Sequence, residues 1–218
     1  MATTSQNPSL VNEDSSIPDR CPAEASDQSV MPVPQAIVLM GVCGCGKTEV
    51  GLQLARLTGG IYRDGDDYHS PENIAKMGRG EPLVDDDRWP WLARLHDEVV
   101  APAVMENGGA PVILGCSALR RVYRDALVGS LEPGLVWFVH LSGDESLILE
   151  RMRARKGHYM KEGMVASQLA ILEEPGANEC SITVSIEPAP DAIAGDILVK
   201  LAGRHREPTS SPFSPTKR

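Results

Sequence analysis

The stretch GVCGCGKT, Gly41–Thr48, decides which fold we expect for this sequence. It matches the pattern G-x-x-x-x-G-K-[ST], whose glycines let the backbone wrap a phosphate chain so that successive N–H groups face its oxygens. The pattern needs a strand before it and a helix after it. Both are predicted, because AIVLM (36–40) is a short apolar run and TEVGLQLARLT (48–58) has apolar side chains at helical spacing. We therefore predict a phosphate-binding loop made of Gly41, Val42, Cys43, Gly44, Cys45, Gly46, Lys47 and Thr48.

Two side chains of this loop suit a nucleotide and its metal ion. Lys47 can reach the β- and γ-phosphates of ATP, and the Thr48 hydroxyl can bind Mg²⁺. The helix that follows presents the positive end of its dipole to the same phosphates. The loop therefore predicts ATP and Mg²⁺ as ligands.

The two cysteines of the loop, Cys43 and Cys45, allow other interpretations. A zinc site is disfavoured, because structural zinc takes four ligands, usually as two separated pairs, and the sequence offers no second pair at such spacing. In a phosphate loop these positions contribute backbone, so small filler side chains are tolerated. A thiol near a helix N-terminus and Lys47 is expected to have a lowered pKa. We keep the hypothesis that oxidation of this pair blocks nucleotide binding.

Strand-like and helix-like segments alternate along the rest of the chain. Further strands are expected at 60–64, 111–116, 135–141 and 182–186. Further helices are expected at 70–78, 90–106, 118–127, 144–156, 164–173 and 190–202. Ser70 and Ser117 are the expected N-caps of two of these helices. Apolar strands that alternate with helices predict an α/β fold, in which a parallel sheet is covered on both faces.

Composition and charge restrict the class of protein. The chain has 218 residues and a formal net charge of −9, which argues against a nucleic-acid or anionic-membrane partner. No apolar run approaches the roughly 20 residues of a membrane span. The five cysteines are irregularly spaced and the N-terminus lacks a secretory pattern, so we expect a reduced, cytoplasmic protein. Residues 35–203 are predicted to form one domain, and 1–34 and 204–218 to be disordered tails.

An acidic segment, DGDDYH (64–69), follows the second expected strand. Ligands of parallel sheets lie beyond the carboxyl ends of the strands. Asp64 and Asp66 are one residue apart and share one side of an extended chain, so both can face the phosphates. One can hold magnesium through water while the other accepts a proton from a substrate hydroxyl. The alternative is a solvated acidic turn.

Two further segments supply cationic and aromatic side chains. In DDDRWPWL (85–92), Arg88 stands beside two tryptophans that we interpret as packing anchors. Arg120 and Arg124 are one helical turn apart after the third strand, a spacing that can clamp a carboxylate or a phosphate. Solvated surface charges are the alternative for this pair.

The run LERMRARKGHYM (149–160) is densely cationic. Arg151 and Arg155 share one helical face, and arginines of this kind can stabilise the charge on a transferred phosphoryl group. A basic helix before a glycine-containing loop predicts a lid, at about 150–163, that closes over ATP and excludes water.

Five sequence blocks, in this order, resemble the gluconokinases, a family of small P-loop sugar-acid kinases. The resemblance covers roughly residues 35–202. The blocks are GVCGCGKT, DGDDYHSPENIAKMGRGEPLVDDDRWPWL, CSALRRVYRD, ARKGHYM and SQLAILEEPGANE. It implies a nucleoside-kinase-like P-loop NTPase fold with a five-stranded parallel sheet flanked by helices, and a lid. It further implies ATP-dependent phosphorylation of D-gluconate at its 6-hydroxyl, giving 6-phospho-D-gluconate for the pentose phosphate pathway, and a homodimer.

The resemblance also implies roles for individual residues. Asp66 would bind the substrate hydroxyl and act as general base, while Asp64 and Thr48 would hold magnesium. The implied catalytic residues are Lys47, Asp66, Arg151 and Arg155. The implied substrate contacts are Asp66, His69, Lys76, Arg88, Arg120, Arg124 and His158.

The sequence departs from the family's usual pattern at two places. Serines are common where Cys43 and Cys45 stand, and lysine is common where Arg120 stands. We expect activity to survive the first change, because backbone amides bind the phosphates, and we expect a carboxylate contact at Arg120 to survive with altered geometry. The alternatives are a P-loop kinase for another small polyol acid such as shikimate, or a non-catalytic ATP-binding redox module.

Overall fold

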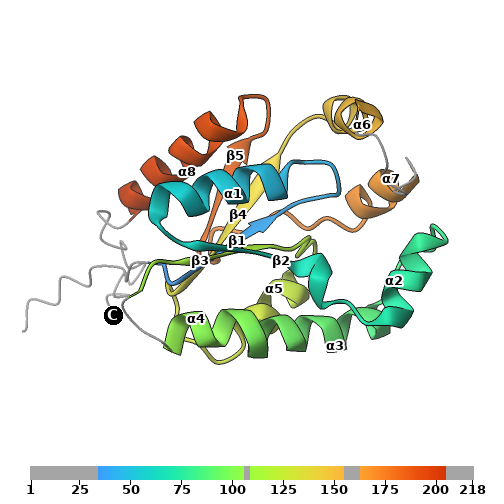
Figure 1. Cartoon of the computed structure of the whole chain (residues 1–218), viewed down its shortest axis with the longest axis horizontal. Helices are drawn as coiled ribbons and strands as arrows, with labels where there is room; N and C mark the ends of the chain where they lie inside the picture. The colour runs from blue at the N-terminus through green and yellow to red at the C-terminus, as the bar shows by residue number, and fades with distance from the viewer. Residues whose placement is uncertain (1–33, 106–108, 155–162, 205–218) are drawn as a thin grey trace, which may run out of the picture.

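Residues 34–105, 109–154 and 163–204 are described by the computed structural model of the chain (Figure 1). Their strands form one five-stranded parallel sheet in the order β2-β3-β1-β4-β5. The strands are β1 (Ala36–Met40), β2 (Ile61–Asp64), β3 (Val112–Gly115), β4 (Val136–Ser142) and β5 (Ser181–Ser185). The predicted parallel α/β sheet is therefore confirmed.

Helices cover both faces of the sheet, as Figure 1 shows. One face carries α1 (Lys47–Thr58), α6 (Glu145–Ala154) and α8 (Pro190–Arg204). The other carries α3 (Asp85–Leu95), a π-helical turn η2 (His96–Val100), α4 (Ala101–Met105) and α5 (Arg121–Val128). The remaining helical segments are the 3-10 turn η1 (Gly65–Tyr68), α2 (Pro71–Gly78) and α7 (Gly163–Leu169).

The central strand β1 shows why the sheet needs cover on both sides. Ala36, Val38 and Met40 pack into the core beneath α3 and α5, whereas Ile37 and Leu39 pack into the core beneath α1 and α8. Alternate side chains of a strand point to opposite faces, so an uninterrupted apolar strand must be buried twice. This arrangement fixes β1 at the centre of the sheet and the phosphate loop at its carboxyl end.

Two helix starts differ from the prediction. The helix expected from residue 90 begins at Asp85, because the Asp87 carboxylate accepts the Val84 N–H at 2.8 Å and acidic side chains suit a helix N-terminus. The helix expected from residue 118, capped by Ser117, begins at Arg121 instead. Ala118 has a left-handed φ of 42°, which interrupts a helix there. In contrast, Ser70 caps α2 as predicted, accepting the Asn73 N–H at 3.2 Å.

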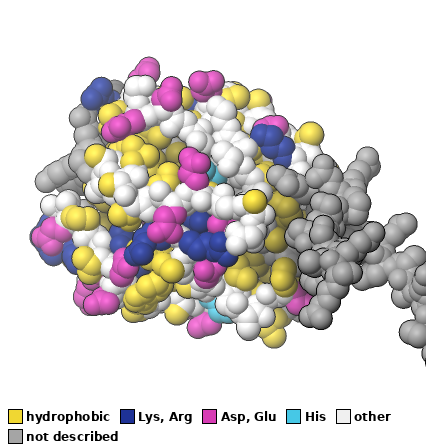
Figure 2. All heavy atoms as spheres, turned by 180° about the vertical axis from the view of Figure 1, so that it is seen from behind, with side chains coloured by type: hydrophobic (Ala, Val, Ile, Leu, Met, Phe, Trp, Pro, Cys, Tyr) yellow, Lys and Arg dark blue, Asp and Glu magenta, His cyan; other side chains and the backbone are white. Residues whose placement is uncertain are grey.

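The surface carries charges of both signs. On the face seen in Figure 2, basic and acidic side chains lie next to one another. Exposed pairs such as Arg79–Glu81 and Arg94–Glu98, each 2.8 Å apart, are of this kind. None of the helices in the described ranges combines the length and apolarity that crossing a membrane requires. The two predicted tails and most of the predicted lid fall outside the described residues.

Candidate active site

A cavity of about 1220 Å³ lies at the carboxyl edge of the sheet. The loops that follow β1, β2 and β3 contribute to its wall, as expected where parallel strands end. Helices α2, α3 and α7 line further parts of it, together with Tyr123 of α5, Met152 of α6 and residues 170–173. Among the lining residues are the predicted site residues Cys43, Gly44, Gly46, Lys47, Thr48, Asp64, Asp66, His69, Arg88 and Arg120.

The phosphate loop has the backbone that its sequence predicts. Gly41, Gly44 and Gly46 have positive φ values of 137°, 83° and 101°. Gly46 stands at the N-cap of α1 and offers no side-chain cap, so the first N–H groups of the helix can receive an anion. Lys47 Nζ folds back onto the carbonyl oxygens of Gly41 and Val42, at 2.9 and 3.1 Å. The ammonium group is thus held at the mouth of the loop.

A set of oxygen atoms lies beside the start of α1. Thr48 Oγ1 donates to Asp64 Oδ2 at 3.3 Å, and Tyr62 Oη lies 3.2 Å from the same carboxylate oxygen. A hydroxyl and a carboxylate are the hard ligands that Mg²⁺ selects, usually together with retained water and phosphate oxygens. The predicted metal residues Thr48 and Asp64 therefore fit the ion. Tyr62 was not among the predicted site residues, although its position two residues before Asp64 puts both side chains on the same side of the strand.

Asp66 stands in η1, directly after β2. The Asp64 side chain accepts the Asp66 N–H at 3.1 Å and so caps this turn. The pKa of the Asp66 carboxyl is raised, mainly because the surrounding protein reduces its hydration. The positive charge of Lys47 lowers this pKa, and the negative charge of Asp64 raises it further. The side chain itself remains accessible, with 69% of its surface exposed. An accessible carboxylate with a raised pKa is suited to accept a proton from a bound alcohol.

His69 forms the floor of this region and is nearly inaccessible. Its ring stacks on Trp91, with centroids 4.3 Å apart and an interplanar angle of 16°. Trp91 Nε1 in turn donates to the Gly65 carbonyl at 2.7 Å, which fixes η1 to α3. Burial, together with the charge of Arg88, lowers the pKa of His69 to about 4, so the ring is neutral at pH 7. Trp91 is a packing anchor, as predicted, whereas Trp89 is 40% exposed.

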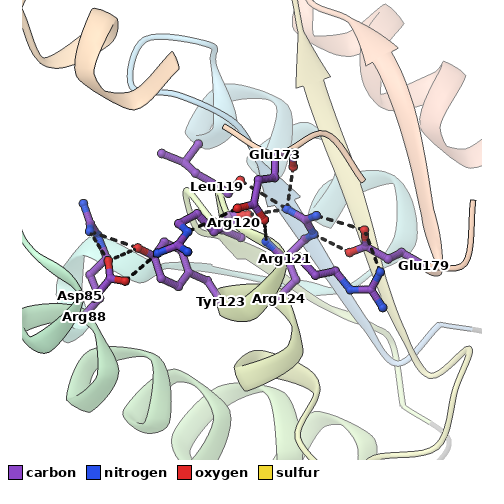
Figure 3. Close-up of polar contacts among 10 residues, drawn as sticks. Asp85, Arg88, Leu119, Arg120, Arg121, Tyr123, Arg124, Glu173 and Glu179 are labelled. Carbon is purple, nitrogen blue, oxygen red and sulfur yellow. Dashed lines mark hydrogen bonds and ion pairs between the residues drawn. The ribbon is translucent and has the colours of Figure 1, made fainter. Parts of the chain in front are cut away.

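Arg88 and Arg120 meet around one carboxylate, that of Asp85 (Figure 3). Arg120 Nη1 lies 2.6 Å from Asp85 Oδ2, and Arg88 Nη1 lies 3.3 Å from Oδ1. Tyr123 Oη donates to the same Oδ1 at 2.5 Å. The hydrogen bond from Tyr123, followed by the charges of Arg120 and Arg88, keeps the pKa of Asp85 below its usual range. The two guanidinium groups thus form a site for a carboxylate, which Asp85 occupies here.

Arg124 does not join this carboxylate site, contrary to the expectation. It is 1% exposed, and its Nε and Nη2 donate to the Glu179 carboxylate at 2.6 and 3.0 Å (Figure 3). Its Nη1 donates to the carbonyls of Ala118 and Glu173 at 3.1 and 2.9 Å. The helical spacing is broken because α5 begins at Arg121, so Arg120 lies in extended backbone and the two side chains diverge. Arg124 ties the segment 173–179 to α5.

Two other predicted site residues, Lys76 and Arg151, have different surroundings. Lys76 Nζ pairs with Asp87 Oδ2 at 2.6 Å and joins α2 to α3 instead of facing the substrate region. Arg151 Nη2 donates to the Ile186 carbonyl at 2.7 Å, and its Nη1 lies 4.0 Å from where a Cβ on Gly46 would stand, so it approaches the phosphate loop. Arg155 and His158 lie outside the described residues.

The loop cysteines pack into the core beside the cavity. Cys43 is 8% exposed and Cys45 is fully buried, packed in the same cluster as Val42 and Ile148. Burial raises the pKa of the Cys43 thiol, and the opposing charge of Lys47 does not reverse the shift. The expectation of a lowered thiol pKa is therefore wrong for Cys43. The helix dipole and Lys47 are outweighed by the loss of hydration.

Comparison with known proteins places this geometry in a family. A family profile described as an AAA domain matches residues 37–172. The gluconokinase of Gluconobacter oxydans is 41% identical over 165 residues, which cover 76% of this chain and 90% of that protein. The thermoresistant gluconokinase of Escherichia coli is 41% identical over 169 residues, which cover 77% of this chain and 94% of that one.

This chain belongs to the gluconokinase family. A solved gluconokinase structure from Sinorhizobium meliloti has 40% sequence identity and a TM-score of 0.69, and covers 80% of this chain and 94% of that chain. The shikimate kinase from Acinetobacter baumannii has a TM-score of 0.52 at 20% identity, which shows a shared fold alone. The predicted resemblance and the predicted kinase fold are both confirmed. The roles of individual residues remain predictions.

Proposed function

We propose that this gluconokinase-family chain transfers the γ-phosphoryl group of ATP to the 6-hydroxyl of D-gluconate, giving ADP and 6-phospho-D-gluconate. One observation carries the proposal: a single cavity is lined by the phosphate loop, by an accessible carboxylate and by two arginines. The first group suits the phosphates, the second an alcohol, and the arginines the anionic end of a sugar acid. The relatives named gluconokinase support D-gluconate as that acid.

At the nucleotide end, the backbone amides of the loop and the N-terminus of α1 hold the phosphates. Lys47 turns from its own loop carbonyls to the β- and γ-phosphates when ATP binds. Arg151, beside Gly46, neutralises charge on the transferred group. Thr48 and Asp64 hold Mg²⁺, directly or through water, and the ion supplies electrostatic stabilisation of the phosphates.

At the acceptor end, Asp66 accepts the proton of the 6-hydroxyl as its oxygen attacks the γ-phosphorus. Arg88 and Arg120 bind the gluconate carboxylate in the position that Asp85 occupies here. His69 is neutral and nearly buried, so it shapes the floor of the site and supplies no positive charge. The two arginines bind one end of D-gluconate and Asp66 binds the other, so together they set the orientation of the substrate.

The same proposal includes the cellular setting. A net charge of −9 and cysteines without a disulfide pattern support a cytoplasmic enzyme without a nucleic-acid partner. Its product would enter the pentose phosphate pathway. The family resemblance supports a homodimer, which sedimentation of the purified chain tests.

The deciding experiment measures ADP release with D-gluconate as the only added acceptor. We expect Mg²⁺-dependent turnover with D-gluconate, a far lower kcat/KM with shikimate, and only background ADP release without acceptor. Preferred turnover of shikimate would contradict the acceptor assignment. ATP binding without product from any sugar acid would favour the non-catalytic module.

A further inference from the structure

Gln168 connects helix α7 to the phosphate loop. Its Oε1 accepts the backbone N–H of Cys43 at 2.6 Å, across 125 residues of sequence. Its side chain also lines the cavity together with Lys47 and Asp66. A backbone N–H carries one hydrogen, and a phosphate oxygen is a stronger acceptor than an amide oxygen. A phosphate oxygen that accepts the hydrogen bond of the Cys43 N–H must therefore displace the Gln168 side chain.

Five residues further along, Glu173 contacts the acceptor side of the cavity (Figure 3). Its Oε1 lies 3.4 Å from Arg120 Nε, and its Oε2 accepts the Arg121 N–H at 2.7 Å. Its own N–H donates to the Leu119 carbonyl at 2.8 Å. Arg120 is thus shared between Glu173 and Asp85 before any acceptor arrives. A substrate carboxylate has to compete with both.

The segment between Gln168 and Glu173 is short and internally bonded. The Ile171 N–H donates to the Gln168 carbonyl at 3.3 Å, and the Leu172 N–H donates to the Leu169 carbonyl at 3.2 Å. Leu172 packs against the cores on both faces of the sheet. Gln168 and Glu173 are therefore joined by a bonded turn and not by a loose loop.

We propose that residues 168–173 couple ATP binding to acceptor binding. Phosphates that take the Cys43 N–H release Gln168, the hold of Glu173 on Arg120 weakens, and Arg120 becomes available to the acceptor carboxylate. The identity of the acceptor rests on the function proposed above. The coupling predicts that a non-hydrolysable ATP analogue tightens the binding of D-gluconate.

Calorimetric titration of the full chain tests this in two arms. In the first, D-gluconate is titrated with and without AMP-PNP and Mg²⁺. We expect the analogue to lower the Kd of D-gluconate about 2- to 10-fold, the scale of one hydrogen bond. By linkage, D-gluconate should lower the Kd of AMP-PNP by the same factor.

Variants of Glu173 probe the acceptor end. Glu173→Gln keeps an oxygen for the Arg121 N–H but removes the negative charge beside Arg120. We expect it to bind D-gluconate more tightly without nucleotide and to lose most of the dependence on AMP-PNP. Glu174→Gln makes the same charge change at the neighbouring exposed position and should behave as the wild type.

Variants of Gln168 probe the nucleotide end in the second arm, which needs no acceptor. Gln168→Ala removes the competitor for the Cys43 N–H and should lower the Kd of AMP-PNP. Gln168→Glu keeps the acceptor but adds a negative charge beside the phosphates, so it should raise that Kd. If the role of Gln168 were purely structural, both substitutions would change the Kd of AMP-PNP in the same direction.

Two results would overturn the coupling. One is an AMP-PNP effect on D-gluconate binding that persists unchanged in Gln168→Ala and Glu173→Gln, or that is missing from the wild type. The other is an equal Kd of AMP-PNP in Gln168→Ala and Gln168→Glu. If D-gluconate neither binds nor turns over, the proposed function fails, whereas the Kd values of AMP-PNP in the two Gln168 variants still decide whether Gln168 competes with the phosphates for the Cys43 N–H.

Discussion

Asp66 combines two properties that a general base for an alcohol needs. Its side chain is accessible from the cavity, and the surrounding walls raise its pKa. The neighbouring Asp67 is also exposed and lines the same cavity. The two residues therefore form a natural test pair.

Substituting Asp66→Asn should lower kcat/KM for D-gluconate by at least about 10²-fold, the scale of a positioned base. The KM for ATP should change little, because the nucleotide is held by the loop. ADP release under saturating ATP measures both quantities. Asp67→Asn, the matched control, should stay within a few-fold of the wild type. Near wild-type turnover in Asp66→Asn would show that another group takes the proton.

His69 makes stability depend on pH in a defined direction. Its Nδ1 is buried and has no hydrogen-bond partner among the described residues, and its pKa falls from 6.5 to about 4. Above pH 6.5 the ring is neutral in both the folded and the unfolded chain. Between pH 6.5 and 4 only the unfolded chain takes up the proton, so the free energy of unfolding decreases as the pH falls.

The variant His69→Phe isolates this effect, because the ring still stacks on Trp91 and no longer titrates. We expect the wild type to lose up to about 3 kcal/mol more unfolding free energy than the variant between pH 6.5 and 4. Urea denaturation at several pH values measures the difference. Parallel pH dependences for the two proteins would mean that His69 is protonated when folded.

Among the elements, α5 shows most clearly how distant residues set local structure. Its first N–H, that of Arg121, is capped by the Glu173 carboxylate at 2.7 Å. Its buried Arg124 forms a two-bond pair with Glu179, which is itself nearly buried. The segment 173–179 thus completes the helix start and is held by it. The element and the segment should be stabilised or lost together.

Replacing Arg124 with leucine should reduce the free energy of unfolding by about 3–5 kcal/mol, since it removes the buried guanidinium group that pairs with the nearly buried Glu179 carboxylate. Denaturant titration followed by circular dichroism measures the loss. Arg94→Ala removes an exposed pair with Glu98 and should change stability by less than about 1 kcal/mol. Equal losses in the two variants would contradict the anchoring role of Arg124.

At the scale of the whole molecule, one cavity serves two ligands that contact different elements. Ligands that bind only the folded state raise its stability, by about 2.7 kcal/mol at 100 times Kd. For a chain of this size that corresponds to a rise in Tm of roughly 5–10 °C. In differential scanning fluorimetry we expect Mg²⁺–AMP-PNP to raise the Tm and D-gluconate to raise it independently. Lys47→Ala should abolish the first rise and keep the second; loss of both would mean that the two sites are not separable.

Much of this architecture could be predicted from local sequence. The apolar strands, the glycine loop and the capped helix α2 each depend on residues within a few positions of one another. Short-range sterics and hydrogen bonds decide such features. The acidic pair after β2 could be assigned to the cavity because parallel strands end at one edge.

Other features depended on partners far along the chain. Arg120 and Arg124 cannot be distinguished by their sequence context. In the fold, Arg124 is buried and pairs with Glu179. Arg120 lies at the cavity, where it pairs with Asp85 and Glu173. The start of α5 depends on a carboxylate 52 residues away. Burial raises the pKa of Cys43, and this burial could not be predicted from the residues of the loop alone.

The sequence by itself determined the phosphate loop, the parallel sheet and the presence of a carboxylate opposite the nucleotide, because each follows from neighbouring residues. Only the tertiary structure decided which arginines face the acceptor and which hold the fold. It also decided that the amide of Gln168 contacts the loop. Charged and amide side chains are long and accept several partners, so their roles are set by which opposite groups folding brings within hydrogen-bond distance.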